Sequence, residues 1–231
     1  MTLAETPLQS FGPEIWVKRV PLRFFTFQMG TRMTVIRLPD GGLFVHSPVK
    51  LNPETRQTVE ALGPVRFLVA PNRLHHLFVA DWAEAFPEAA LWGVRDLIKK
   101  RADLPWTGTL GDAAEPGWAN ALDQAVLRSS YQDEAVFCHR ASRTLILVDF
   151  FESVWPEDQW HYRLFGRLLG TWKWPTTTYD QRLTFRRRAE TRETVRRILG
   201  WDFDRIVLAH GRLVERDGKS VFRDGAAWLK P

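Results

Sequence analysis

Short runs of aromatic and β-branched residues alternate with turn residues over the first fifty positions. The runs are Ile15–Val20, Phe24–Met29, Met33–Leu38 and Leu43–His46. Pro21, Gly30 and the turn Asp40-Gly41-Gly42 separate them. Because short loops containing Asp-Gly commonly join antiparallel neighbours, this pattern predicts a series of antiparallel strands.

Helical and strand patterns alternate in the next part of the chain. Asn52 and Pro53 are typical of the start of a helix, which we expect to run to about Leu62. Later, the continuous apolar or alternating runs predict strands at Val65–Ala70, Ala90–Val94, Gln124–Ser129, Glu134–His139 and Arg143–Asp149, with a helix from Leu74 to Phe86. The Pro- and Gly-rich stretch Lys99–Asn120 is predicted to be a loop.

The last third of the sequence is first helical and then mixed. The predicted elements are an amphipathic helix at Glu157–Leu169, an aromatic loop at Trp172–Tyr179, a second amphipathic helix at Arg187–Leu199 and a buried strand at Arg205–Ala209. In the first helix, Trp160, Leu164, Phe165 and Leu168 share one face. This order of elements predicts an α/β (α+β) fold with two sheets packed face to face and helices outside, in a single domain over residues 1–231.

Composition narrows the functional classes only slightly. The chain is 45% hydrophobic and 26% charged, which is typical of a globular protein, and its net charge of +5 favours an anionic ligand without indicating nucleic acid. Cys138 is the single cysteine, so an intramolecular disulfide is excluded. With no signal-peptide pattern at the start and no apolar run long enough to span a bilayer, we expect a cytoplasmic protein without a transmembrane segment.

Residues with chemical potential follow three of the buried strands. Asn72, His75 and His76 come after Val65–Ala70. Asp149 ends its strand, and His210 follows Arg205–Ala209. Because the loops at the carboxyl ends of buried strands converge, we expect these side chains to form one site.

The order of these motifs resembles that of the metallo-β-lactamase superfamily. The resemblance is carried by the stretches Arg32-Met33-Thr34-Val35-Ile36-Arg37-Leu38, Gly41-Gly42-Leu43-Phe44-Val45-His46-Ser47-Pro48, Val69-Ala70-Pro71-Asn72-Arg73-Leu74-His75-His76 and His139-Arg140-Ala141-Ser142-Arg143-Thr144-Leu145. The resemblance covers roughly residues 15 to 214. Within the superfamily, the chain resembles an uncharacterised branch, a domain of unknown function. The resemblance implies a four-layer αββα sandwich.

The resemblance also implies that the metal site is degenerate. The family's metal-binding loop reads His-x-His-x-Asp-His; with His76 on the final His, Pro71 and Arg73 replace the first two ligands and His75 replaces the Asp. A shift by one residue restores no more of the motif. Tyr131 and Gln132 stand where the family's middle His is expected. Asp149 and His210 match the bridging Asp and the last His.

Six histidines are too few for the family's two-metal site once those outside the motif are set aside. A single metal needs three protein ligands and an open position. The leading hypothesis is therefore a hydrolase-like protein of unknown substrate with at most one zinc, iron or manganese ion, held by His76 or His75 with Asp149 and His210. Adjacent residues in a helix diverge by about 100°, so both histidines reach one point only in an irregular turn.

Three further interpretations stay open. Asn72, Trp172 and Trp174 are candidate substrate-binding residues, with the two tryptophans forming a lid over a small-molecule ligand; Asn72 is also a candidate turn and cap residue. The chain could instead be a non-catalytic binding domain for an anionic or aromatic ligand that kept the fold and lost the metal chemistry. Finally, the basic stretch Arg182–Arg197 carries a stripe of Arg188, Arg192 and Arg196, which suits either a solvated helix face or an anion-binding surface.

Overall fold

Two β-sheets form the centre of the molecule. The computed structural model describes residues 4–24 and 26–231. In these residues the first sheet has seven strands in the order β1 (Gln9–Gly12), β2 (Ile15–Val20), β5 (Thr31–Arg37), β6 (Leu43–His46), β7 (Val65–Ala70), β8 (Ala90–Gly93) and β9 (Trp106–Thr109). The second has four, in the order β10 (Leu122–Leu127), β11 (Glu134–His139), β12 (Thr144–Leu147) and β13 (Arg205–Leu208).

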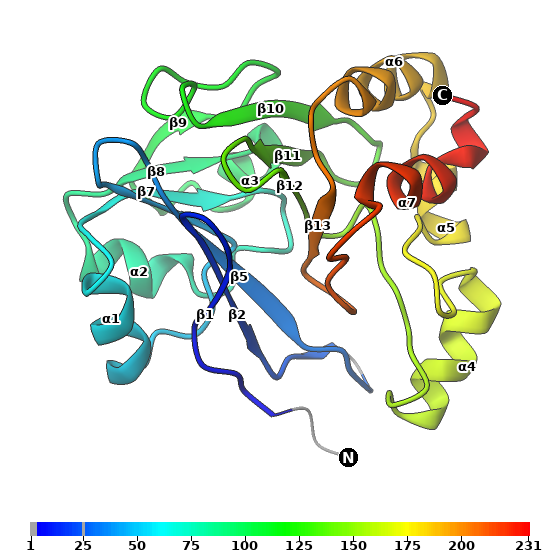
Figure 1. Cartoon of the computed structure of the whole chain (residues 1–231), viewed down its shortest axis with the longest axis horizontal. Helices are drawn as coiled ribbons and strands as arrows, with labels where there is room; N and C mark the ends of the chain where they lie inside the picture. The colour runs from blue at the N-terminus through cyan, green and yellow to red at the C-terminus, as the bar shows by residue number, and fades with distance from the viewer. Residues whose placement is uncertain (1–3, 25) are drawn as a thin grey trace.

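Helices cover the outer faces of both sheets. The helices beside the first sheet are α1 (Pro53–Glu60), α2 (Val79–Ala85) and α3 (Arg95–Lys100). Those on the side of the second sheet are α4 (Trp160–Leu169), α5 (Tyr179–Thr184), α6 (Arg188–Leu199) and α7 (Gly218–Gly225), followed by a short 3₁₀ turn at Ala227–Leu229. Figure 1 shows α1 and α2 at one side and α6 and α7 at the other, with the sheets between them. This is the predicted four-layer αββα arrangement.

Side-chain alternation in the second sheet explains the layering. Phe137, Ile146 and Val207 point toward the first sheet and belong to the core between the sheets. Their chain neighbours Val136, Leu145 and Ile206 point the other way and pack with residues of α6 and α7. Because successive strand residues face opposite sides, the second sheet contributes side chains to two hydrophobic cores, one between the sheets and one under the helices.

The parallel strand pairs determine where a site can form. β6, β7, β8 and β9 are parallel neighbours in the first sheet, and β12 and β13 are parallel in the second. The two sheets are linked beyond the end of β7, where Asn72 forms a bridge with Glu134 and the Ala135 N–H donates to the carbonyl of Pro71 at 2.8 Å. This link brings the loop after β7 against the start of β11, so the strand ends that carry the candidate residues meet.

Several predicted boundaries were wrong. The stretch Lys99–Asn120 contains β9, whose pairing with β8 overrides its Gly-rich sequence, and α3 reaches into its start. The predicted helix Leu74–Phe86 begins only at Val79, after irregular turns. In the predicted strand Phe24–Met29, Phe25 lies outside the described residues, and the flanks form the two-stranded ribbon of β3 (Arg23–Phe24) and β4 (Phe27–Gln28).

The predicted apolar face of α4 is largely exposed. Trp160 is 70% exposed and Leu168 66% exposed. Phe165 alone of the four packs inward, against Phe27 of β4. None of the helices in the residues that the structure describes is long and apolar enough to cross a membrane.

Candidate metal centre

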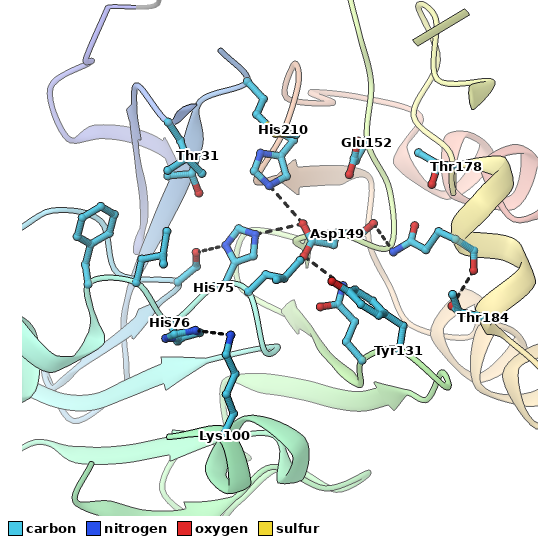
Figure 2. Close-up of a pocket in the computed structure, with 18 of the residues that line it drawn as sticks. Thr31, His75, His76, Lys100, Tyr131, Asp149, Glu152, Thr178, Thr184 and His210 are labelled. Carbon is cyan, nitrogen blue, oxygen red and sulfur yellow. Dashed lines mark hydrogen bonds and ion pairs between the residues drawn. The ribbon is translucent and has the colours of Figure 1, made fainter. Parts of the chain in front are cut away.

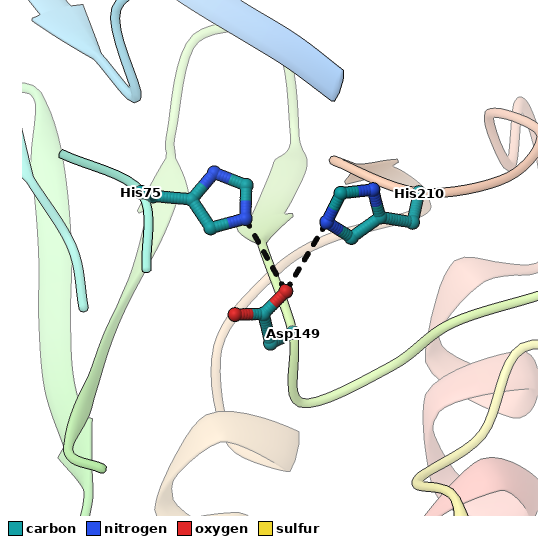
Figure 3. A group of neighbouring side chains, drawn as sticks. All are labelled: His75, Asp149 and His210. Atoms are coloured by element: carbon teal, nitrogen blue, oxygen red, sulfur yellow. Dashed lines mark hydrogen bonds and ion pairs between the residues drawn. The ribbon is translucent and has the colours of Figure 1, made fainter. Parts of the chain in front are cut away.

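Three buried side chains from three different strand ends converge on one point. His75 lies in the turn after β7, Asp149 lies two residues beyond β12, and His210 lies two residues beyond β13. The Nε2 atoms of both histidines lie 3.2 Å from the same oxygen, Oδ1 of Asp149. Their ligand atoms all lie within 4.8 Å of one another. Figure 3 shows both imidazole rings facing the carboxylate of Asp149.

Each histidine is oriented by a partner on its other ring nitrogen. His75 Nδ1 lies 2.7 Å from Ser47 Oγ, just beyond β6. His210 Nδ1 lies 2.7 Å from the backbone carbonyl of Gly30, just before β5. Because a carbonyl only accepts, Nδ1 of His210 donates, and Nε2 is the atom presented to the centre. Partners of this kind fix the ring orientation of metal-binding histidines.

The second oxygen of Asp149 is held by two amides. Asn72 Nδ2 donates to Oδ2 at 2.6 Å, and Gln132 Nε2 donates to the same atom at 3.3 Å. Asn72 also accepts, through Oδ1, the backbone N–H groups of Leu74 and His75, both at 2.9 Å. Asn72 therefore shapes the irregular turn that positions His75, and it also orients the carboxylate of Asp149. A turn role was one of the two interpretations of Asn72 from the sequence.

A buried glutamate fixes the backbone around Asp149. The carboxylate of Glu134 accepts the N–H groups of Val148, Asp149 and Phe150 at 2.8 to 3.0 Å. Burial and the nearby charge of Asp149 raise the pKa of Glu134 to about 8. These three hydrogen bonds determine the path of the chain as it leaves β12, and therefore the position of Asp149.

A buried arginine holds the loop that carries His210. Arg32 of β5 donates to the carbonyl of Leu208 and, at 3.1 Å, to that of Gly211, so its guanidinium binds the backbone on both sides of His210. Burial lowers the pKa of Arg32 to about 9. Sequence reasoning assigned no role to Arg32, Ser47 or Glu134. Arg32 and Glu134 could have been noticed in the sequence because each is a charged residue in a predicted strand, at a position where an apolar residue is expected.

The electrostatic environment favours an ionised Asp149. Burial alone would raise the pKa of Asp149, but the charge of His75 and the hydrogen bonds from the two histidines hold this pKa well below its usual range. For His210, burial acts to lower the pKa, and the hydrogen bond and charge of Asp149 outweigh it, so the pKa is raised. The negative charge of Asp149 thus favours a positive charge beside it, on a histidine or on a metal ion.

The centre opens into a cavity of about 510 Å³. This volume is in the usual range for small-molecule sites. His75, Asp149 and His210 line it together with Glu152, as Figure 2 shows. The pKa of Glu152 is raised to about 7, mainly by its burial.

The structure separates the two adjacent histidines. His76 also lines the cavity, but its Nε2 lies 2.9 Å from Lys100 Nζ and its Nδ1 lies 3.3 Å from Arg101 Nη1. Burial and these two cations lower the pKa of His76 to about 4. His75, and not His76, lies with Asp149 and His210.

The two candidate lid tryptophans are not brought to the centre. Trp172 packs near Met29 and Val154, with the guanidinium of Arg167 3.8 Å above its ring centroid. Trp174 is 44% exposed. Neither tryptophan is among the described residues that line the cavity.

The basic stripe of α6 is partly occupied by the chain's own C-terminal segment. Arg192 donates to the carbonyl of Leu229 at 2.6 Å, and the guanidinium of Arg188 lies 6.0 Å from the ring centroid of Trp228. Arg196 lies 3.9 Å from Glu193. These contacts give part of the stripe a structural role.

The donor set at the centre fits a single metal ion. Two imidazole nitrogens and a carboxylate oxygen form a common three-ligand set for zinc and for non-haem iron. Ligands about 2.1 Å from a tetrahedral zinc ion lie about 3.4 Å apart. The 3.2 Å between each Nε2 atom and Asp149 Oδ1 is close to this spacing, whereas the set as a whole spans up to 4.8 Å, so the two imidazoles would move closer together around a bound ion. His75, Asp149 and His210 would therefore hold the ion, with the cavity side as the open position.

Comparison with known proteins agrees with the fold and assigns no activity. Residues 13–159 match the family described as "Domain of unknown function (DUF4336)". The chain belongs to this family. No curated protein sequence matches the chain.

Solved structures of metallo-β-lactamases are similar over nearly the whole chain. The metallo-β-lactamase from Pontibacter korlensis has a TM-score of 0.66 at 8% identity, covering 98% of this chain and 99% of its own. The FIM-1 metallo-β-lactamase from Pseudomonas aeruginosa, in a mono-zinc form, has a TM-score of 0.66 at 10% identity, covering 100% and 98%. The Flv1 flavodiiron core from Synechocystis sp. PCC6803 has a TM-score of 0.65 at 12% identity, covering 98% and 60%. The chain therefore has the metallo-β-lactamase fold.

Proposed function

We propose that this protein is a hydrolase that holds one divalent metal ion, zinc, iron or manganese, at His75, Asp149 and His210. One observation carries the proposal: the Nε2 atoms of two oriented histidines and one carboxylate oxygen converge at the wall of a ligand-sized cavity. When bound, such an ion polarises a substrate carbonyl or phosphoryl oxygen and lowers the pKa of a water molecule.

The chain's own residues supply the positioning and the proton transfer. Ser47 and Gly30 fix the two imidazoles, and Asn72 and Gln132 fix the carboxylate. Glu152 lines the same cavity with a pKa of about 7, so it can exchange a proton with a leaving group near neutral pH. The similarity to metallo-β-lactamases supports the reaction type and leaves the substrate open.

A second candidate function is favoured by the number of partners that Asp149 has within the protein. Oδ1 faces both histidines and Oδ2 accepts from two amides, so Asp149 with one protonated histidine forms a stable buried network without metal. In that case the protein is a non-catalytic binding domain that uses the same cavity.

Hydrolysis assays distinguish the two functions. Wild-type protein loaded with zinc, iron or manganese is incubated with esters, lactones, thioesters and phosphodiesters, in parallel with protein treated with EDTA. We expect metal-dependent turnover that is abolished in Asp149→Asn and reduced about 100-fold in Glu152→Gln, which keeps the metal ligands. Stoichiometric metal without turnover on any substrate, or equal turnover after EDTA treatment, would contradict the hydrolase.

A further inference from the structure

The cavity contains a cation that forms no ion pair with a carboxylate of the described residues, although Asp96, four residues earlier in the sequence, attracts it at longer range. Lys100, at the end of α3, is the one Lys or Arg among the described residues that line the cavity. Its Nζ donates to the carbonyl of Arg73 at 3.0 Å and to His76 Nε2 at 2.9 Å. None of the ion pairs found in the described part of the chain includes Lys100. Because an ammonium has three donors and two are used here, one remains for a ligand.

The two arginines near Lys100 already have partners, so Lys100 is the cation that can pair with a ligand in the cavity. Arg101 is paired with Asp103 at 2.7 Å. Arg73 donates to the carbonyl of Tyr131 and stacks on its ring, with 5.5 Å from the guanidinium to the centroid. Both arginines add positive potential at Lys100. An anionic group beside Lys100 would therefore gain a direct partner and the field of two further cations.

Much of the cavity wall is apolar. Leu74, Leu77 and Phe78, from the turn after β7, line the cavity, and Leu22 and Met29 line it from the N-terminal part of the chain. Leu77 is 58% exposed although it is a large hydrophobic side chain. Burial of such a wall by a ligand's hydrocarbon part is favourable, at about 25 cal/mol per Å².

The charges in the cavity are divided between its two ends. Asp149, Glu152 and Asp180 line the side of the metal centre and α5, whereas Lys100 lies with His76 on the opposite side of His75. In Figure 2 the Lys100 side chain rises from below toward His76, away from Glu152 and Thr178. A ligand with one anionic end is thus oriented with that end at Lys100 and its other end toward the centre.

We propose that the cavity binds a small amphiphilic anion, whose carboxylate or phosphate group pairs with Lys100 and whose apolar body lies against the wall of Leu22, Met29, Leu74, Leu77 and Phe78. The inference rests on the proposed function in that it names the substrate class of the same site. The binding step itself requires neither a metal ion nor turnover.

Titration calorimetry on EDTA-treated protein tests this with octanoate and octanol, which share a chain length and differ in charge. We expect octanoate to bind at least tenfold more tightly than octanol. Lys100→Met should weaken octanoate about tenfold, the value of a charge-assisted hydrogen bond, without changing octanol. Lys100→Arg should retain octanoate binding, and Lys99→Met, which alters the adjacent exposed lysine of α3, should change nothing.

Octyl phosphate in the same assay shows which anionic headgroup is preferred, and binding of either anion in a Lys100-dependent way supports the proposal. Equal affinities for octanoate and octanol, or unchanged affinity in Lys100→Met, would overturn it. Octanoate binding without hydrolysis of any ester, lactone, thioester or phosphodiester by the metal-loaded protein would remove the proposed hydrolase and keep this inference. Hydrolysis without Lys100-dependent anion binding would do the reverse.

Discussion

The Nδ1 atom of His210 lies 2.7 Å from the carbonyl oxygen of Gly30, a residue 180 positions earlier in the chain. Gly30 precedes β5 in the first sheet, and His210 follows β13 in the second. One hydrogen bond therefore orients a candidate metal ligand of one sheet through the backbone of the other. The geometry of the centre depends on how the two sheets are packed.

Arg32 provides the first test of that dependence. Arg32→Met removes the donors to the carbonyls of Leu208 and Gly211 and leaves those buried acceptors unpaired. We expect the free energy of unfolding to fall by about 2–3 kcal/mol and zinc affinity to fall 10- to 100-fold, as for other changes behind a metal ligand. Urea unfolding and competition with a chelator measure the two effects.

Arg37→Met is the matched control. It lies on the same strand, but its guanidinium pairs with the partly exposed Glu14. We expect little change in stability and no change in zinc affinity, because water screens this pair. Equal zinc affinities in Arg32→Met and the wild type would show that Arg32 does not position His210.

Asn72→Asp tests the amide that bridges the two strand ends. The replacement keeps an acceptor for the N–H groups of Leu74 and His75, but it exchanges the donor facing Asp149 for a second carboxylate. We expect about 2–4 kcal/mol of destabilisation at pH 7, because two buried like charges repel. Chemical denaturation gives the value.

Asn52→Asp is its control, at an exposed site. Asn52 caps the first turn of α1 by accepting the Thr55 N–H at 2.7 Å, and its Nδ2 donates to the exposed Glu5 at 3.3 Å. Water screens the repulsion between the new carboxylate and Glu5, and a negative charge at a helix N-terminus is favourable, so stability should change little. If both variants were equally stable, Asn72 would not carry the proposed hydrogen bond to Asp149.

The pH dependence of stability should contain a contribution from His139, far from the centre. Burial lowers the pKa of His139 in the folded protein to about 4, while the unfolded chain retains the ordinary value of 6.5. Between these values the unfolded state binds the extra proton. Stability is therefore lost as the pH falls from 6.5 toward 4, by up to about 1.4 kcal/mol per pH unit for one group.

Replacement His139→Gln should reduce this slope, measured as the free energy of unfolding against pH in urea titrations. Gln keeps a polar group near Ser142, whose hydroxyl lies 2.8 Å from His139 Nδ1. The same slope in the variant and the wild type would contradict the assignment.

The fold was predictable because it follows from local alternation along the strands. The order of strands, turns and strand ends indicated two packed sheets, and the comparisons confirm the fold. Pairing between distant strands could not be read in this way: β9 was missed because its few residues, Trp106–Thr109, become a strand only beside β8. Periodicity identified the shared apolar face of Trp160, Leu164 and Leu168, but it does not show whether anything covers such a face.

The sequence showed which strand ends form the site, but not how their side chains are arranged there. The three convergent residues were all candidates, but the choice between His75 and His76 depended on the turn after β7. Asn72 fixes that turn through hydrogen bonds that no spacing rule reveals. Gln132 stands where the resemblance placed a histidine, and there it holds Asp149 by a hydrogen bond.

Metal content tests the central claim most directly. Purified protein is loaded separately with zinc, iron and manganese, dialysed and measured by mass spectrometry, with circular dichroism to confirm that each variant is folded. We predict one ion per chain in the wild type and in His76→Ala, and almost none in His75→Ala and Asp149→Asn. Sub-stoichiometric metal in the wild type with all three ions, or full occupancy in His75→Ala, would contradict a metal centre at His75, Asp149 and His210.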